Sequence, residues 1–168
     1  MSANARDMPI VKLESPRFEN SRPPLISRLA GRCNANTLDD LLALWRRFAV
    51  PIGGIPGQIG RARYGVCSDM FNRTDGFHYL SGVEVSESSV LPKPFSHVQI
   101  PAQLYLIFPC REQVSRIRHT VNATWYQWLP ESGQKAPSAA PGAPDFLERY
   151  REALDPQFGM GDVESGFR

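Results

Sequence analysis

The chain has 168 residues, of which 42% are hydrophobic and 21% charged, and its formal net charge at pH 7 is only +2. This composition is typical of one globular domain and excludes a disordered chain, a collagen-like rod and a coiled coil. The basic residues are scattered along the sequence rather than grouped, so we expect no direct DNA binding.

The sequence also gives no sign of a membrane, a metal or a cofactor. It lacks a long apolar window and a secretion signal, which predicts a cytoplasmic protein that does not bind membranes. The cysteines Cys33, Cys67 and Cys110 are far apart and have no partner at metal-ligand spacing, so we interpret them as buried free thiols. Neither a phosphate-binding loop nor an activated nucleophile is present, and we predict no cofactor and no catalytic residue.

Residues 1–22 are polar and uneven, and we expect an irregular arm there, with "PIVKLE" as a candidate short edge strand. Residues 23–168 are predicted to form the folded domain, beginning with an extended segment over residues 24–33. A helix follows from about Thr37, the capping residue, to the stop at Pro51, because apolar residues recur every three or four positions.

Two runs of β-type residues, 61–70 and 77–86, are separated by a segment containing the turn signal Asp75-Gly76 and predict a hairpin. Side chains alternate between the faces of a strand, so Tyr79 and Glu84 should point in opposite directions.

The C-terminal half begins with a connection broken by prolines, "LPKPFSHV", and then a strand from Gln103 to Phe108 that Pro109 stops. A second helix is predicted over residues 112–129, with Trp125 and Trp128 inward, Tyr126 off that axis, and Pro130 and Gly133 ending it. A loop rich in Pro, Ala, Ser and Gly, a short amphipathic segment "FLERYREALDP" and a final strand in "GDVESGFR" complete the chain.

Two segments share an outline: "LWRRFAVP" (44–51) and "TWYQWLP" (124–130) each place a Trp three residues before another aromatic and end at proline. Each predicted helix also follows one strand and precedes extended segments. We therefore predict an α+β fold of two pseudo-symmetric β-α-β-β repeats, with an antiparallel sheet, both helices on one face, and Trp45 and Trp125 in equivalent places.

The motifs "LWRRFAVPIGGIPGQIG", "YGVCSDM", "YLSGVEV", "IPAQLYLIF", "WYQWLPESG" and "PDFLERY…LDPQFGMGDVE" occur in an order that resembles the gyrase-inhibitor-like (GyrI-like) effector-binding domain over residues 24–164. This domain is also the ligand-sensing half of AraC-type and multidrug-responsive activators. The resemblance implies a central cleft for aromatic, often cationic molecules, with a buried Glu and surrounding aromatics.

Two features depart from that family. About twenty residues precede the first predicted strand, too few for the helix-turn-helix domain of such regulators, and the C-terminal "SGFR" is more polar than the family's last strand. Direct transcription control by this chain alone is therefore not expected, and the last strand is in question.

The candidate acids are Glu148, which matches the family's acid two residues before a tyrosine, and Glu84, the alternative suggested by the alternation of side chains along its strand. A carboxylate screened from water together with ring faces would favour a cation. The predicted aromatic supply, each member of which could instead belong to the core, is Trp45, Tyr64, Tyr79, Tyr105, Trp125, Trp128 and Tyr150. We predict that Trp125 forms the floor of the cleft and that Trp128 packs beneath Trp125.

Three functions stay open. The first is a stand-alone module that binds a hydrophobic, cationic aromatic small molecule. The second is a hydrolase of strained, cyclopropane-type genotoxins, because some relatives of this domain resemble such enzymes, with Glu148 and either Tyr150 or Tyr64 directing water. The third is an accessory protein that binds gyrase or a separate DNA-binding regulator. Either a monomer or a homodimer is compatible with the sequence.

Overall fold

The computed structural model describes residues 12–21, 25–33, 38–49, 53–68, 77–86, 90–111, 117–135, 144–151 and 163–167. The strands are β1 (Arg17–Ser21), β2 (Leu25–Cys33), β3 (Gln58–Ser68), β4 (Phe77–Val85), β5 (Ser96–Gln99), β6 (Gln103–Cys110), β7 (Pro144–Tyr150) and β8 (Val163–Phe167). The helical segments are α1 (Leu38–Ala49), α2 (Ile117–Ala123), the π-helix η3 (Thr124–Trp128) and α3 (Leu129–Ser132).

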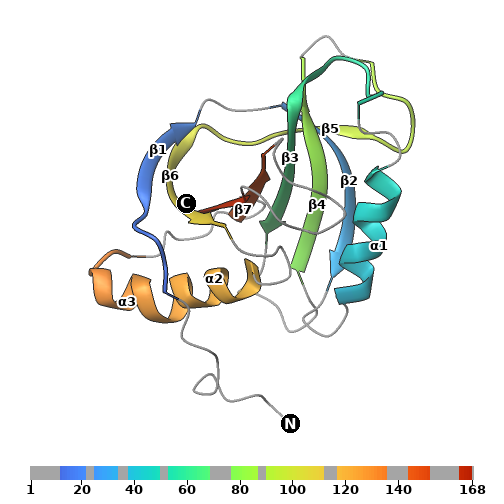
Figure 1. Ribbon diagram of the computed structural model, residues 1–168. Helices are drawn as coiled ribbons and strands as arrows, with labels where there is room; N and C mark the ends of the chain where they lie inside the picture. The colour runs from blue at the N-terminus through green and yellow to red at the C-terminus, as the bar shows by residue number, and fades with distance from the viewer. Residues whose placement is uncertain are drawn as a thin grey trace.

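The strands form one antiparallel sheet of eight strands in the order β1-β6-β8-β7-β3-β4-β2-β5 (Figure 1). Outward from the central pair β7 and β3, both halves have the same order. In each half, the strand that follows the helix (β3 or β7) is central, and the next strand of the chain (β4 or β8) lies beside it. The strand before the helix (β2 or β6) comes third, and an additional edge strand (β5 or β1) is outermost. The predicted pair of β-α-β-β repeats is therefore confirmed.

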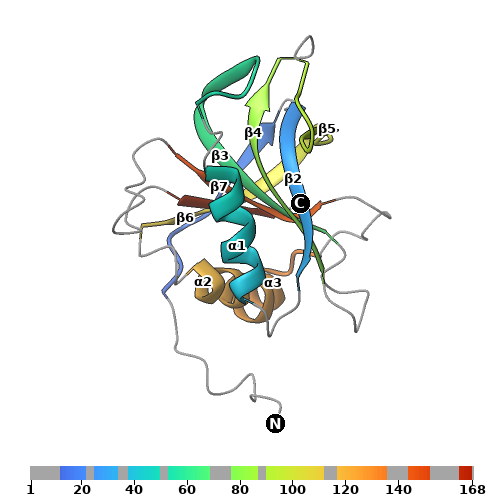
Figure 2. The same cartoon turned by 90° about the vertical axis from the view of Figure 1, so that its right-hand side faces the viewer.

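Both helices cover the same face of the sheet, which we call the helix face (Figure 2). Helix α1 packs on β2 and β4, and α2 packs on the equivalent strands β6 and β8. The central strands β3 and β7 consequently lie along the seam between the two helices. A core cluster fills this layer and contains Leu44, Phe48, Ile55, Cys67, Tyr79, Val83, Val85, Leu106, Phe108, Val121 and Phe146.

Helix α1 agrees with the prediction from its apolar spacing. Leu44 and Phe48 are buried one turn apart, whereas Arg46 and Arg47 are exposed in the last turn, where they complement the negative end of the helix dipole. The predicted cap Thr37 lies outside the described residues.

The second helix, formed by α2, η3 and α3, extends further at its C-terminal end and is less regular than predicted. It continues through Pro130 to Ser132 and ends at Gly133, whose φ of 71° is left-handed. Residues 124–128 form a π-helix in which the Leu129 N–H donates to the Thr124 carbonyl. Proline has no N–H and its ring collides with the carbonyl of an α-turn, so a wider turn before Pro130 lets the helix continue. The start of the predicted helix, residues 112–116, lies outside the described part.

Two strands lie where the sequence predicted none. Strand β1 lies within the segment expected to be irregular, whereas residues 12–14 of the candidate edge strand "PIVKLE" are not in a strand. Strand β5 lies in the connection broken by prolines and pairs with β2. A short strand at a sheet edge forms through backbone hydrogen bonds to one neighbouring strand, so its sequence needs little alternation of apolar and polar residues.

The end of the chain was also predicted incompletely. Pro109 does not end β6, which runs to Cys110. The pairing of β6 with β1 ends before Pro109, so the missing N–H of this proline costs no hydrogen bond to β1. The final strand predicted in "GDVESGFR" is confirmed as β8, which lies inside the sheet between β6 and β7. The segment "FLERY" is extended as part of β7.

Cys67 and Cys110 are buried free thiols, as predicted, and the side chain of Cys33 lies outside the described part. None of the helices in the described residues has the length and hydropathy needed to span a bilayer.

Candidate functional site

The candidate site centres on Glu148 in the central strand β7. Side chains alternate along this strand, so Phe146, Glu148 and Tyr150 face the helices while Leu147 and Arg149 face the opposite side of the sheet. Glu148 is only 7% exposed. A carboxylate is thus buried in the seam between the two helices.

Three aromatic side chains surround this carboxylate. The Tyr79 hydroxyl donates to Glu148 Oε2 at 2.8 Å, and the Tyr150 hydroxyl donates to the same oxygen at 2.7 Å. Trp45 of α1 donates from Nε1 to the Tyr79 hydroxyl at 3.0 Å. Its ring meets the Tyr150 ring edge to face, with centroids 5.3 Å apart. We call Trp45, Tyr79, Glu148 and Tyr150 the Glu148 cluster.

The electrostatics of the Glu148 cluster are suited to a positively charged ligand. Burial raises the pKa of Glu148, although the hydrogen bonds from Tyr150 and Tyr79 act in the opposite direction. Burial and the Glu148 charge raise the pKa of Tyr79 and Tyr150 well above the usual value, so both hydroxyls remain protonated donors. Among the described residues, no Lys or Arg pairs with Glu148 and no donor reaches its Oε1.

Two small residues beside Glu148 were missed from the sequence. Gly65 of β3 is paired with both Glu148 and Ser81, so the three form a row across the sheet. A Cβ at Gly65 would lie 2.0 Å from the Tyr79 hydroxyl oxygen and 2.7 Å from Glu148 Oε2, so only glycine leaves room for the cluster. A glycine inside the predicted strand "RARYGVC" was the available signal for this close approach.

Ser81 adds an unusual polar atom to the same row. The residue is fully buried, and its Oγ has no hydrogen-bond partner within the part of the chain that the structure describes. Paired residues in neighbouring strands share a face, so Ser81 lies on the helix face with Glu148. Buried hydroxyls are normally satisfied, which makes this position a candidate contact for a polar atom of a ligand.

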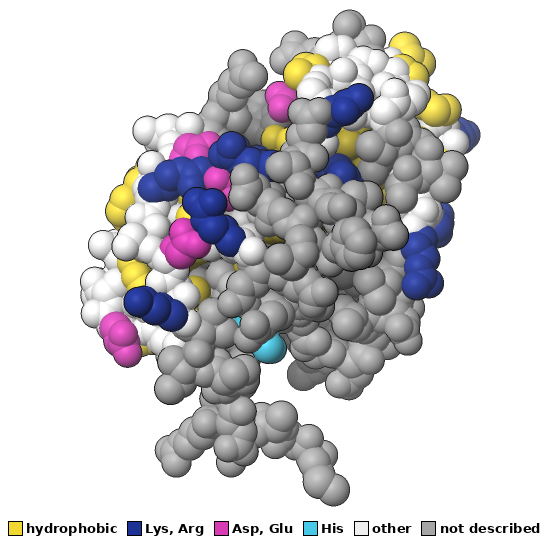
Figure 3. Space-filling model, viewed as in Figure 1, with side chains coloured by type: hydrophobic (Ala, Val, Ile, Leu, Met, Phe, Trp, Pro, Cys, Tyr) yellow, Lys and Arg dark blue, Asp and Glu magenta, His cyan; other side chains and the backbone are white. Residues whose placement is uncertain are grey.

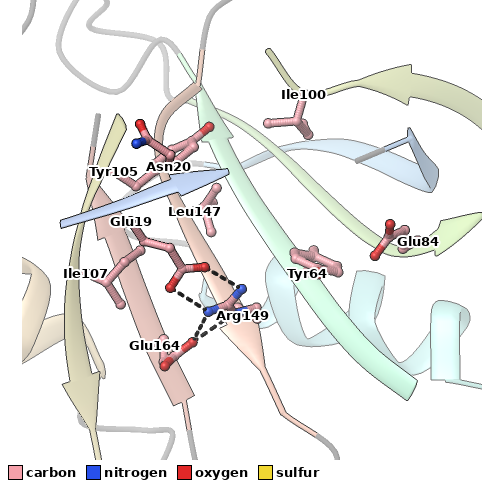
Figure 4. Close-up of a pocket in the computed structure, with 10 residues that line it drawn as sticks. All are labelled: Glu19, Asn20, Tyr64, Glu84, Ile100, Tyr105, Ile107, Leu147, Arg149 and Glu164. Atoms are coloured by element: carbon pink, nitrogen blue, oxygen red, sulfur yellow. Dashed lines mark hydrogen bonds and ion pairs between the residues drawn. The ribbon is translucent and has the colours of Figure 1, made fainter. Parts of the chain in front are cut away.

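The remaining sequence-predicted residues lie elsewhere. Glu84, Tyr64 and Tyr105 are on the opposite face of the sheet, which we call the open face, where they line a pocket of about 250 Å³ (Figure 4). Its other lining residues are Glu19, Asn20, Ile100, Ile107, Leu147, Arg149 and Glu164. The structure therefore does not bring Tyr64 next to Glu148, as the hydrolase hypothesis with that pair requires.

Trp125 and Trp128 point inward, as predicted, and Tyr126 is 64% exposed. Both tryptophans pack against the core cluster between the helices and the sheet, and the Trp128 ring meets Phe108 edge to face at 5.3 Å. Trp125 thus shares a layer with the Glu148 cluster, whereas its role as the cleft floor stays a prediction.

An ion-pair network at one end of the open-face pocket was also missed from the sequence. Arg149 donates from Nε to Glu164 at 2.7 Å and from Nη1 to Glu19 at 3.2 Å, and Arg17 and Arg151 also donate to Glu164. Burial would raise the pKa of Glu164, but these hydrogen bonds and charges lower it to about 2. Figure 3 shows acidic and basic side chains interspersed on the side where β1 and β6 lie, and the described residues on this face form no continuous basic patch.

Comparison with known proteins identifies the family. The family model of Cass2, an integron-associated effector binding protein, matches residues 56–162, which include Gly65, Tyr79, Glu148 and Tyr150. The chain belongs to this Cass2 family. It is therefore an effector-binding domain of the GyrI-like type that the sequence motifs predicted.

A curated relative of this Cass2 family member is the transcriptional regulator BrlR of Pseudomonas aeruginosa, which is 31% identical over 119 residues. The match covers 70% of this chain and 43% of BrlR, so the chain corresponds to less than half the length of that regulator.

Solved structures share the fold at low identity. SAV2435 bound to tetraphenylphosphonium superposes with a TM-score of 0.64 and 12% identity, covering 92% of this chain and 93% of SAV2435. An integron cassette protein from the mobile metagenome of Vibrio cholerae also gives a TM-score of 0.64 and 12% identity, covering 92% of this chain and 95% of that protein.

Proposed function

We propose that this effector-binding domain binds a hydrophobic, aromatic organic cation in the seam between the two helices (the helix seam), with Glu148 as its counter-ion. One observation carries the proposal: a carboxylate 7% exposed is held by two tyrosine hydroxyls and has no ion-pair partner among the described residues. A structural acid at such depth is normally paired with a base.

The physical basis is the cost of burying a charge. An isolated buried carboxylate tends to take up a proton, which agrees with the raised pKa of Glu148. A cation with a delocalised charge brings a compensating charge without losing much hydration. Each aromatic face that it contacts adds about 0.5–2 kcal/mol, so Trp45, Tyr79 and Tyr150 reinforce the preference for a cation.

Ligand entry requires movement in the cluster. Trp45 of α1 is hydrogen-bonded to Tyr79 and packed on Tyr150, so it covers the carboxylate on the helix side. The proposed ligand therefore displaces Trp45, and its tryptophan fluorescence should respond to binding.

Tetraphenylphosphonium, the ion bound to the structural neighbour SAV2435, is the first probe for this proposal. Calorimetric titration into the full chain should show binding that Glu148→Gln weakens by roughly 30-fold or more, because removing one partner of a buried charge pair costs about 2 kcal/mol or more. The control is Glu131→Gln, an exposed acid in α3. Equal affinity of the wild type and Glu148→Gln would refute the role of this carboxylate.

A second candidate is hydrolysis of a strained-ring substrate. It is favoured by the 2.7 Å contact between Tyr150 and Glu148, and by the raised pKa of this acid, which would make it a better general base near neutral pH. Catalytic turnover of a cyclopropane-bearing alkylating compound, lost in Glu148→Gln, would support it. Stoichiometric binding without product would favour the binding module.

The biological setting that we propose is regulation. BrlR is a transcriptional regulator, and the match to 43% of its length supports a setting in which effector binding to this domain changes its association with a DNA-binding protein or gyrase. A stoichiometric protein partner whose association with the chain changes with tetraphenylphosphonium would support this setting, and a ligand-independent monomer or homodimer would contradict it.

A further inference from the structure

The open-face pocket is separated from the Glu148 cluster by the sheet itself. In β7, Leu147 and Arg149 line the pocket while Glu148 between them faces the helices. We propose that the pocket is a second, independent binding site, which takes a compact organic ammonium ion with Glu84 as its counter-ion and Tyr64 as its ring contact.

The charges of the pocket favour a cation over an anion. Its described lining contains the carboxylates of Glu19, Glu84 and Glu164 and one cation, Arg149. Arg17 and Arg151 also donate to Glu164, so among the described residues Glu84 is the lining carboxylate that no arginine balances. The guanidinium of Arg149 donates from all three of its nitrogens to Glu19 and Glu164, so its donors already face carboxylates. An anion would have to compete with these bonds and approach Glu84 as well.

Glu84 lies at the other end of the pocket. Its side chain is half-buried and forms no hydrogen bond or ion pair with the side chains that the structure describes. Figure 4 shows Glu84 at one side, the Glu19–Arg149–Glu164 group at the opposite side, and Tyr64 between them. The Glu84 carboxylate, which has no partner among the described side chains, thus faces the same pocket as the ring of Tyr64.

Tyr64 is within reach of the Glu84 charge. Burial raises the pKa of Tyr64, and the negative charge of Glu84 raises it further. A cation placed between Glu84 and the Tyr64 ring would gain both an ion pair and a cation–π contact, the latter about 0.5–2 kcal/mol.

The remaining lining sets the size and polarity of the guest. Ile100, Ile107 and Leu147 give the pocket an apolar wall, and its volume is about 250 Å³. Pockets for drug-sized ligands usually range from about 300 to 1,000 Å³. The pocket therefore suits a small ammonium ion with one apolar group, whereas tetraphenylphosphonium with its four rings is too large.

Benzyltrimethylammonium is the probe for this second site. It should be titrated into the full-length wild type, Glu84→Gln, Tyr64→Leu and Glu148→Gln, with calorimetry and amide NMR shifts as readouts. Tyr64→Leu keeps apolar bulk while removing the ring. We expect at least a five-fold loss of affinity at this site in Glu84→Gln and in Tyr64→Leu. In Glu148→Gln, which removes the proposed counter-ion of the helix seam, amide shifts centred on residues 64, 84 and 147 should remain.

The same variants titrated with tetraphenylphosphonium separate this inference from the proposed function, since Glu84→Gln should leave that affinity unchanged. Loss of benzyltrimethylammonium binding in Glu148→Gln but not in Glu84→Gln would overturn the second site, because the ion would then occupy the helix seam. Absence of binding to the wild type at millimolar concentration would overturn it too.

Discussion

At the scale of single residues, the chemistry of this domain depends on the direction in which each side chain leaves its strand. Glu148 and Glu84 were both credible counter-ions in the sequence, but they face opposite sides of one sheet. The close contact between Tyr79 and Glu148 also depends on the missing side chain of Gly65, which leaves the space that both residues occupy.

Gly65→Ala tests that space. The added methyl group would lie 2.0 Å from the Tyr79 hydroxyl oxygen, so Tyr79 must move away from Glu148. We expect a loss of roughly 1–3 kcal/mol of stability in urea unfolding, as for other overpacked cores, and weaker tetraphenylphosphonium binding.

The matched control for Gly65→Ala is Gly31→Ala in strand β2, where the new Cβ would meet Leu44 at an ordinary 3.7 Å. Equal stability and equal ligand affinity of the two variants would contradict the steric role of Gly65.

The pH dependence of ligand affinity tests the charge of Glu148. Its pKa is raised by burial, and a cation binds the ionised form, so binding at a pH below that pKa releases a proton from the carboxylate. Affinity for tetraphenylphosphonium should therefore rise as the pH increases through the Glu148 pKa and then become constant. In the rising range, titration in buffers of different ionisation enthalpy should show proton release in the wild type and none in Glu148→Gln. A wild-type affinity that stays constant from acidic to alkaline pH would contradict the mechanism.

At the scale of elements, the second helix shows how local chemistry and packing combine. The periodic apolar stripe predicted the inward Trp125 and Trp128, but Pro130 suggested an end that the structure does not have. The π-turn over residues 124–128 accommodates the proline, and the helix ends only where Gly133 takes a left-handed conformation.

Gly133→Ala tests this helix end. No atom lies within 4 Å of the Cβ that alanine would add, so the cost is the left-handed backbone alone, about 1–2 kcal/mol in urea unfolding. Gly133→Asn should cost less, because asparagine tolerates this conformation better. If alanine and asparagine are both neutral, Gly133 is not the residue that ends the helix.

At the scale of the whole molecule, the two faces of the sheet are held by different forces. The helix face has an apolar core around the Glu148 carboxylate, which has no ion-pair partner in the described part of the chain. The open face instead has an ion-pair network that joins β1 to β7 and β8 through Glu19, Arg149 and Glu164. Because these strands come from distant parts of the chain, the network fixes the edge of the sheet to its centre.

Glu164→Gln tests the network. The folded-state pKa of Glu164 is lowered to about 2, so its contribution to stability is present above the unfolded pKa near 4.5 and lost as the pH falls towards 2. At pH 7 we expect a loss of roughly 1–3 kcal/mol in urea unfolding, moderated because Arg17 and Arg151 are partly exposed. The difference from the wild type should shrink at pH 3 and below.

The control for this variant is Glu14→Gln, which removes an exposed pair with Arg111 and should change stability by less than about 1 kcal/mol at either pH. A Glu164→Gln deficit that is the same at pH 7 and at pH 2 would show that Glu164 acts through packing rather than charge.

Local sequence patterns were sufficient to predict the α+β class, the two repeats, helix α1, the hairpin of β3 and β4, and Glu148 as a candidate acid. Each of these depends on short-range information: a period of 3.6 or 2 residues, a turn pair, or a motif order. Strands β1 and β5 were missed because short polar strands take their identity from the neighbour that they pair with.

Which of the candidate residues lie next to one another depends on how the strands pair in the folded sheet. Strand parity predicts that Tyr79 and Glu84 diverge, but register across β4, β3 and β7 was needed to place Ser81, Gly65 and Glu148 in one row. Register is set by long-range pairing between strands that are far apart in the chain, and no local pattern encodes it. For that reason the residue types of the site could be read from the sequence, whereas their division between a seam under the helices and a pocket on the open face could not.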